Sequence, residues 1–336
     1  MALDPRDVRH AGQIRAGTTG RRSGHRFERE LAQRISLVDP GTLRLNEAHA
    51  SHIIDGDAAV ELVQYICRSL GLRHVRVVSA EWLGGRATVR EPELVSDYTV
   101  PSRLAKGSSK SDVAVYVDGG GRSLVVGVST KTCTTRAPTN AQLYFSTATA
   151  FCALLRRRGI EVSERAETAM RMFCGDAGYR PADMPDEARG RSPQTDASRW
   201  FWEELPRPAL KEWAQILGGR QADVTRILLR DAYDDDPLPP DFVLHGRGQC
   251  RSIADYRMAV FTVEELVALS CAYSGFGTRE YRIRKGTFRG DPSPHRAPRF
   301  GYVQFQRGGQ RQHPTQLQFN LQAGYFNKLP AQHARQ

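Results

Sequence analysis

Three residues near the middle of the chain have the types and spacing for chemistry on a phosphate group. Asp112 precedes one apolar stretch, and Ser129 and Lys131 end the next one. The two stretches read as β-strands joined by the glycine-rich turn at residues 118–121. In a hairpin over residues 110–132, an acid at the start of one strand lies beside a lysine at the end of its neighbour. This pairing suits a site that holds a metal ion and a water molecule against a phosphate.

Such a site needs oxygen ligands for a hard cation and a group that holds the attacking water. Mg²⁺ is bound mainly by carboxylates and carbonyl oxygens. Asp112 would supply the first carboxylate, the Thr130 carbonyl a further ligand, and Lys131 would position the water and stabilise charge on the phosphate. The alternative is a structural ion pair between Asp112 and Lys131. Magnesium is therefore the predicted cofactor, and the hairpin by itself lacks a second carboxylate.

The hairpin resembles the active-site hairpin of the PD-(D/E)xK nuclease superfamily, which includes most type II restriction endonucleases. In that pattern, an Asp precedes an acid-x-Lys tripeptide on the next strand, and this chain has Asp112 followed by Ser129-Thr130-Lys131. Restriction enzymes that cut CCGG-type and CCNGG-type sites also carry Ser-x-Lys and take a glutamate from a neighbouring helix. The stretch 141–158, where those enzymes would supply it, contains no acid. The resemblance covers roughly residues 57–158.

Two glutamates earlier in the chain are candidates for the missing carboxylate. Glu61 lies on a helix predicted for residues 57–70, in the place that the superfamily gives to the first helix beside the site. Glu28 lies in GHRFERELAQRI, which resembles the G-x-x-F-E helix of the same superfamily. Topology favours Glu61 slightly as the catalytic residue and metal ligand. For each glutamate, a solvated helix position is the alternative.

The elements around the hairpin predict an α/β fold. Helical spacing of apolar residues, alternation and turn residues set the expected order. The predicted elements are a helix from residue 25, a helix over 57–70, a strand over 74–81, the hairpin, a helix over 141–158, a strand at 170–174, helices over 198–205 and 208–229, a strand near 242–245 and a helix over 262–271. This order indicates a central mixed β-sheet flanked by helices, the core of the restriction-endonuclease-like fold. Residues 234–236, three consecutive aspartates, read as a solvated turn.

The C-terminal region has the composition of a DNA-reading β-ribbon. Residues 303–306 and 317–321 each alternate apolar side chains with carboxamides, and basic residues precede and connect the two stretches. Arginine pairs with guanine edges and glutamine with adenine edges in the major groove, whereas a polar outer strand face is the plainer interpretation. The candidate DNA-binding residues are Arg282, Arg284, Lys285, Arg289, Gln304, Gln306, Arg307, Gln310, Arg311 and Gln312.

Length and charge limit the class of protein. With 336 residues, a formal net charge of +11 and a pI near 9.6, the chain has room for a large core and an excess of basic groups that favours a polyanionic partner. The predicted division is a basic arm over 1–24, a nuclease domain over 25–275 and the DNA-recognition ribbon over 276–336, packed on the same domain. No apolar run is long enough for a membrane span, no signal peptide is evident, and the six cysteines form no CxxC pair.

The sequence therefore predicts a Mg²⁺-dependent type II restriction endonuclease that cuts both strands of duplex DNA. A homodimer is expected because two active sites are needed for a palindromic site. A cytoplasmic location is expected from the lack of an apolar span, a signal peptide and paired cysteines, and the resemblance implies a DNA methyltransferase as functional partner. The alternatives are another nuclease of this superfamily, acting in repair or on modified DNA, and a non-catalytic DNA-binding protein with a degenerate nuclease fold.

Overall fold

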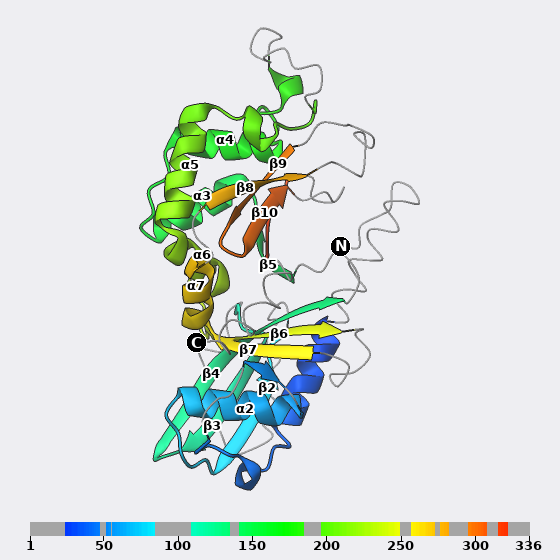
Figure 1. The fold of residues 1–336 in the computed structure, drawn as a ribbon, viewed down its shortest axis with the longest axis vertical. Helices are drawn as coiled ribbons and strands as arrows, with labels where there is room; N and C mark the ends of the chain where they lie inside the picture. Colours follow the sequence, from blue (N-terminus) through cyan, green and yellow to red (C-terminus); the bar gives the residue numbers. More distant parts are fainter. Residues whose placement is uncertain are drawn as a thin grey trace. The chain divides into compact units, whose positions relative to one another are not determined.

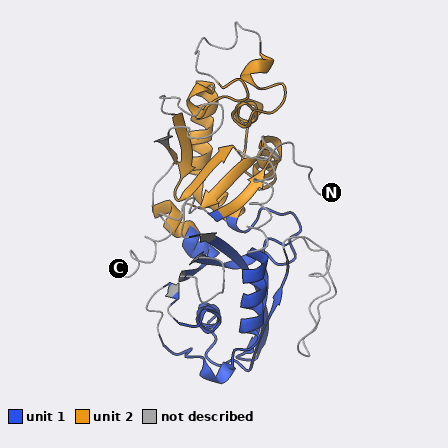
Figure 2. Ribbon diagram, turned by 90° about the vertical axis from the view of Figure 1, so that its right-hand side faces the viewer, with its two compact units in different colours: residues 1–141, 229–266, 323–336 blue, residues 142–228, 267–322 orange. Residues whose placement is uncertain are grey.

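The chain contains two compact units. A computed structural model describes residues 24–47, 52–54, 56–84, 109–134, 141–184, 196–248, 257–272, 276–281, 295–307 and 315–321. Unit 1 comprises residues 1–141, 229–266 and 323–336, and unit 2 comprises residues 142–228 and 267–322 (Figure 2). The chain therefore passes between the units several times, and the boundary expected at residues 275–276 is not one of these breaks.

Unit 1 is built on a six-stranded sheet. Across the sheet, the strands are β1 (Ile53–Ile54), β7 (Arg257–Thr262), β6 (Pro240–Gly248), β4 (Arg122–Thr134), β3 (Val113–Gly119) and β2 (Val77–Trp82). β4 and β6 run parallel, whereas the other neighbouring strands run antiparallel. Helix α2 (Ala58–Ser69) lies beside this sheet (Figure 1). The mixed sheet with flanking helices confirms the predicted fold class.

The hairpin of β3 and β4 forms in the register that its sequence predicts. Gly119 pairs with Arg122, so Gly120 and Gly121 form a two-residue turn, and both have positive φ angles of 57° and 74°. A turn of this kind matches the twist of antiparallel strands and strongly favours glycine at both positions. The valines of β3 are buried, as expected for a strand with neighbours on both sides.

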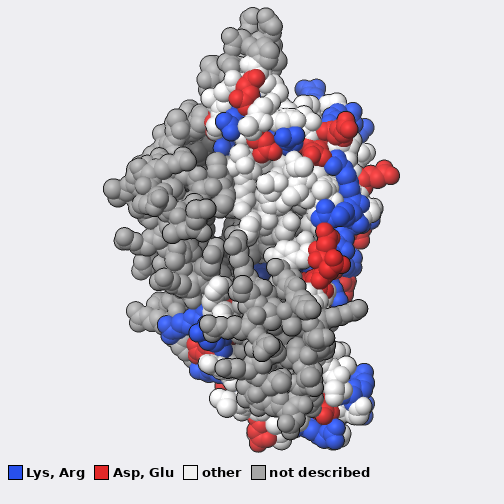
Figure 3. Space-filling view, turned by 180° about the vertical axis from the view of Figure 1, so that it is seen from behind, with Lys and Arg blue, Asp and Glu red and all other residues white. Residues whose placement is uncertain are grey.

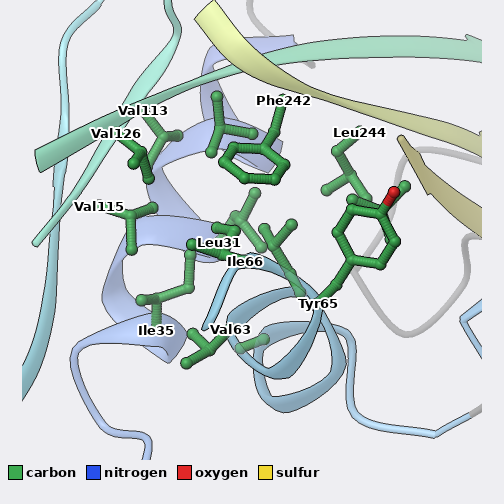
Figure 4. Close-up of a cluster of buried hydrophobic side chains, with 14 of the residues drawn as sticks. Leu31, Ile35, Val63, Tyr65, Ile66, Val113, Val115, Val126, Phe242 and Leu244 are labelled. Atoms are coloured by element: carbon green, nitrogen blue, oxygen red, sulfur yellow. The ribbon is translucent and has the colours of Figure 1, made fainter. Parts of the chain in front are cut away.

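The core of unit 1 lies between the sheet and two helices. A helix over residues 24–35 buries Leu31 and Ile35, and α2 buries Val63 and Ile66. In Figure 4 these side chains point toward the valines of β3 and the aromatic ring of Phe242 on β6. The apolar residues of each helix recur at three- and four-residue spacing, which places them on one face. The two helices predicted from residues 25 and 57 are thus confirmed.

Unit 2 contains helices and a second sheet. Its helices are α3 (Ala148–Arg157), α4 (Glu164–Cys174), α5 (Arg207–Gly219) and α6 (Gln221–Leu229), and α7 (Val263–Ala272) begins in unit 1 and ends in unit 2. Short 3₁₀ turns are η1 (Pro40–Thr42) in unit 1, and η3 (Pro181–Asp183) and η5 (Trp202–Glu204) in unit 2. The strands of the second sheet, in order, are β5 (Ala141–Ser146), β11 (Leu317–Leu321), β10 (Val303–Arg307), β9 (His295–Phe300) and β8 (Phe276–Tyr281).

The helix predicted for residues 198–205 was wrong, because only the 3₁₀ turn η5 forms there. Two further predicted elements of this unit were also wrong. The helix predicted for residues 141–158 begins only after Thr147, whose side chain accepts a hydrogen bond from the Ala150 amide, and residues 141–146 form strand β5 instead. The strand predicted for residues 170–174 is the end of helix α4, because Ser163 caps a helix that extends to Gly175. In both places, aromatic and apolar residues fit either period when only a short window is considered.

The C-terminal strands form a larger sheet than the predicted two-stranded ribbon. β10 and β11 pair antiparallel with Val303 opposite Leu321 and Phe305 opposite Phe319, so the predicted pairing and its apolar face are correct. However, β9 and β8 extend the sheet on one side and β5 on the other. The apolar face is therefore a core surface of unit 2. Among the described residues, no helix is long and apolar enough to span a bilayer.

Gly127 lies where β4 changes partners, and its missing side chain is a requirement of the fold. A Cβ atom built there would lie 2.2 Å from Ser111 Oγ and 2.8 Å from the Pro239 carbonyl. We therefore expect Gly127→Ala to lower the free energy of unfolding by about 1–3 kcal/mol, because the backbone must shift. Urea denaturation followed by circular dichroism would measure this. Gly219→Ala, where a Cβ meets nothing within 4 Å, is the control and should cause no loss; equal effects would contradict the steric explanation.

Candidate active site

Asp112 lies beside the point where strand β4 changes its pairing from β3 to β6. It immediately precedes β3, and its amide donates to the Val128 carbonyl at 2.9 Å, while its own carbonyl accepts from the Leu83 amide at 3.0 Å. β4 pairs with β3 up to Val128 and with β6 from Gly127 onward. The backbone of Asp112 is thus fixed by the chain segments on both sides of it. Its side chain remains 23% exposed at the point where the strands diverge.

The tripeptide Ser129-Thr130-Lys131 surrounds the carboxylate of Asp112 with donors. Asp112 Oδ2 accepts from the Thr130 amide at 2.6 Å and from the Ser129 hydroxyl at 3.2 Å. Lys131 Nζ donates to Ser129 Oγ at 2.6 Å and to the Thr130 carbonyl at 3.0 Å, and lies 3.6 Å from Asp112 Oδ2. The hairpin therefore brings together the acid, the serine and the lysine that its sequence singled out.

Glu28 is the second carboxylate at this position. Its side chain is buried, accepts a hydrogen bond from Trp82 Nε1 at 2.9 Å, and is hydrogen-bonded to the Thr130 side chain. Burial, and then the nearby negative charge of Asp112, raise the pKa of Glu28 from its ordinary value of 4.5 to about 7. Lys131 acts in the opposite direction. Two like charges and one cation therefore interact within the same partly dehydrated site.

The helix over residues 24–35 explains why Glu28, rather than Glu61, lies here. Phe27 and Leu31 anchor this helix in the core, and Glu28, one position from that stripe, faces the end of the hairpin. Glu61 lies half-exposed in the first turn of α2 and takes no part in the hydrogen bonds that join Asp112, its tripeptide and Glu28. The structure therefore brings Glu28, and not the slightly preferred Glu61, next to Asp112.

Two further residues at the site were missed by reasoning from the sequence. Lys110 is buried beside the hairpin, with its amide bonded to Asp236 Oδ2 at 2.8 Å, and burial together with the charge of Lys131 lowers the pKa of Lys110 to about 7. The rarity of lysine was a usable signal, because only six of the 48 basic residues are lysine and two of them lie in this hairpin. Trp82 ends β2. Its contact with Glu28 depends on the pairing of β2 with β3, which places Trp82 opposite Val113. Of the three aspartates at 234–236, which were interpreted as a solvated turn, Asp236 thus contacts the backbone beside the site.

The oxygen atoms gathered here suit a hard divalent cation. Mg²⁺ is usually held by one or two carboxylates, with water and substrate phosphate completing its shell. Asp112 and Glu28 would provide those carboxylates and the Thr130 carbonyl a third oxygen, and the pKa of Glu28 is raised by burial and by the charge of Asp112 although Lys131 lies nearby. Among the described residues, no group of three or more His, Cys, Asp or Glu side chains forms a cage. The donor set fits magnesium and offers no thiolate or imidazole cluster for zinc.

The candidate DNA-binding residues fall into two groups. Gln304 and Gln306 lie on β10, where they pair with Asn320 and Gln318, and Gln306 is exposed. Arg307 ends β10, and its guanidinium donates to the hydroxyl of Ser198 at 3.1 Å and to its carbonyl at 3.3 Å. These contacts tie Arg307 to unit 2. The other candidates, which lie outside the described residues, are Arg282, Arg284, Lys285, Arg289, Gln310, Arg311 and Gln312.

The basic excess of the chain is concentrated outside the described residues. Counted along the sequence, the described residues carry almost no net charge, so nearly all of the +11 belongs to the remaining segments. Many described arginines are paired locally, as in Arg165 with Glu212 at 3.4 Å and Arg220 with Asp223 at 2.6 Å. Figure 3 shows basic and acidic side chains interspersed along one edge of the molecule. Residues 1–23 and 282–294 are the most basic of the other segments.

Comparisons with known proteins give limited information. No protein family and no curated protein sequence matches the chain. Among solved structures, the restriction endonuclease MspI in complex with its cognate DNA aligns with a TM-score of 0.44 and 13% sequence identity, over 78% of this chain and 78% of that chain. With so few identical residues, the geometry around Asp112 is the stronger guide to what this chain does.

Proposed function

We propose that the chain is a Mg²⁺-dependent type II restriction endonuclease, which hydrolyses both strands of duplex DNA at a specific sequence. The observation that carries this proposal is the convergence of Glu28 on Asp112 and Lys131 from a separate helix. A serine in place of the second acid of the hairpin would leave the site one carboxylate short, and Glu28 supplies it. This placement also weakens the alternative of a degenerate, non-catalytic fold.

Each residue has a distinct task in this reaction. Asp112, Glu28 and the Thr130 carbonyl would hold the cation, whose chemistry when bound would be to polarise the phosphate and to lower the pKa of a water molecule. Lys131, whose ammonium lies among the same oxygens, orients the attacking water and stabilises negative charge on the phosphate. Ser129 links Lys131 to Asp112 through its hydroxyl, so it fixes the lysine rather than binding the cation.

Cleavage of both strands requires two such sites. Because a palindromic sequence has two-fold symmetry, a homodimer places one site on each strand. A methyltransferase that protects the same sequence in the host is the functional partner of such an enzyme. A repair nuclease or one that depends on modified DNA is the alternative within the same superfamily.

Digestion of unmodified plasmid DNA tests this function. Incubation with Mg²⁺ should give discrete fragments, and the same incubation with EDTA should give none. Asp112→Asn, Lys131→Ala and Glu28→Gln should each slow cleavage by at least about a hundredfold, because each removes a group that stabilises the transition state. DNA binding measured in EDTA should persist.

Glu61→Gln is the matched control for Glu28→Gln in the same digest. Both changes remove one carboxylate from a helix of unit 1, and only Glu28 contacts the site. Wild-type cleavage by Glu28→Gln, or loss of cleavage by Glu61→Gln alone, would show that the carboxylate has been assigned to the wrong helix. A smear in place of discrete fragments would favour a non-specific nuclease.

The raised pKa of Glu28 should make the stability of the metal-free protein depend on pH. Because the pKa of Glu28 is raised in the folded state, the folded chain holds this proton more tightly than the unfolded chain, and stability falls as the pH rises from 4.5 through 7. Glu28→Gln removes this loss. In EDTA, we compare the free energy of unfolding of the variant with that of the wild type by urea denaturation at pH 5 and at pH 8. This difference should be larger, in favour of the variant, by about 1–3 kcal/mol at pH 8. An identical difference at both pH values would contradict the raised pKa.

The segment over residues 282–294 should supply phosphate contacts. Replacing its four basic residues by glutamine should weaken binding to a plasmid fragment in EDTA and reduce the slope of log K against log salt by about 3–4, because each phosphate contact releases about one counterion. The four changes are Arg282→Gln, Arg284→Gln, Lys285→Gln and Arg289→Gln.

A control with the same loss of charge uses four exposed arginines that have acidic neighbours. These changes are Arg44→Gln, Arg76→Gln, Arg165→Gln and Arg220→Gln. The control should leave the salt dependence nearly unchanged. If both quadruple variants reduce the slope equally, the effect belongs to overall charge and not to this segment.

A further inference from the structure

Trp82 occupies a position that connects the helix of Glu28 to the sheet. It is the last residue of β2 and lies opposite Val113 on β3, and the amide of the next residue, Leu83, donates to the Asp112 carbonyl at 3.0 Å. Its indole Nε1 donates to Glu28 Oε2 at 2.9 Å. One short segment of chain therefore contacts both carboxyl-bearing residues, through its backbone at Asp112 and through its side chain at Glu28.

The hydrogen bonds of Glu28 come from strands on the two sides of Asp112. β3, which follows Asp112, lies between β2 and β4 in the sheet. Trp82 on β2 donates to Glu28 from one side, and Thr130 on β4 is hydrogen-bonded to Glu28 from the other. The carboxylate is thus held across the start of β3, which is where the Asp112 side chain lies.

The indole ring is itself held in place by the helix that carries Glu28. The guanidinium carbon of Arg29 lies 4.5 Å from the centroid of the Trp82 ring, and the ring of His25 lies 5.7 Å away at an angle of 59°. A cation over the face of an indole is attracted by the negative charge of its π-system. Arg29 is exposed, so no burial requirement explains its place against this ring.

We propose that Trp82 is a positioning residue for Glu28, and that Arg29 fixes the orientation of its ring. An indole N–H can only donate, so Trp82 holds one oxygen of Glu28, Oε2, as an acceptor and fixes the orientation of the carboxyl group. Groups that hydrogen-bond a ligating carboxylate commonly change metal affinity or activity by 10–100-fold when removed. This role rests on the proposed function of the same site.

The decisive variant is Trp82→Phe, which keeps an aromatic ring and removes the donor. We expect the Mg²⁺ concentration for half-maximal cleavage to rise at least tenfold, while the rate at saturating Mg²⁺ recovers most of its wild-type value. The affinity for DNA in EDTA should not change. Without DNA, the rise in melting temperature produced by a fixed Mg²⁺ concentration should become smaller, which is a readout independent of activity.

Two controls separate positioning from general damage. Trp200→Phe removes a comparable indole hydrogen bond, from Nε1 to the Tyr179 carbonyl at 3.1 Å, within unit 2, and should leave the Mg²⁺ dependence unchanged. Arg29→Met removes the cation over the Trp82 ring from an exposed position and should shift the Mg²⁺ dependence in the same direction by a smaller factor. Arg26→Met changes the same charge on the same helix and should not shift it.

The outcomes distinguish this inference from the proposed function. If Glu28→Gln abolishes stabilisation by Mg²⁺ but Trp82→Phe and Arg29→Met bind Mg²⁺ like the wild type, Trp82 does not position Glu28. A loss of activity in Trp82→Phe that is the same at every Mg²⁺ concentration also overturns the inference, and Arg29→Met decides the matter if Trp82→Phe does not fold. If neither the wild type nor Glu28→Gln responds to Mg²⁺, the proposed function itself fails.

Discussion

The central constraint in this protein is the placement of two carboxylates in one partly dehydrated site. Glu28 is buried close enough to Asp112 for the charge of one to raise the pKa of the other. Such an arrangement costs stability unless a cation or a proton relieves it. A fold that needed only an ion pair would require Lys131 and Asp112 alone. An ion pair alone therefore does not explain the second buried acid, whereas the proposed function gives it a role as a metal ligand.

The sheet of unit 1 creates this site by changing the partner of one strand. β4 pairs with β3 along its first half and with β6 along its second half, and Gly127 permits the close approach of Ser111 and the Pro239 carbonyl at the change. Asp112 lies at the opening between them. Its backbone is fixed by neighbouring segments, and its side chain remains 23% exposed. The helix over residues 24–35 then adds Glu28, one polar residue beside its apolar stripe, to Asp112 and Lys131.

The sequence predicted the local parts of this arrangement and missed those that depend on distant contacts. The hairpin, the helix of Glu28 and α2 follow from glycine conformation and apolar periodicity, which act within a few residues. The choice between Glu28 and Glu61 depends on which helix packs beside the start of β3, and the contact that shows this, between Glu28 and Trp82, joins residues 54 positions apart. The roles of Trp82 and Lys110 have the same origin, because burial and strand register bring them to the site. The strand at residues 141–146 was misread because its partner, β11, lies far along the chain.

The distribution of charge completes the functional picture. The described residues are nearly neutral overall, so the excess of positive charge lies in the remaining segments, while in the site the ammonium of Lys131 lies 3.6 Å from Asp112 Oδ2. Arginine dominates the chain, yet both cations beside Asp112 are lysines. A guanidinium stays charged and fixes planar contacts, whereas an ammonium is compact and its pKa responds to burial. A compact cation can share the oxygens of Ser129, Thr130 and Asp112, as Lys131 does, and the proposed function would use the same ammonium on a phosphate.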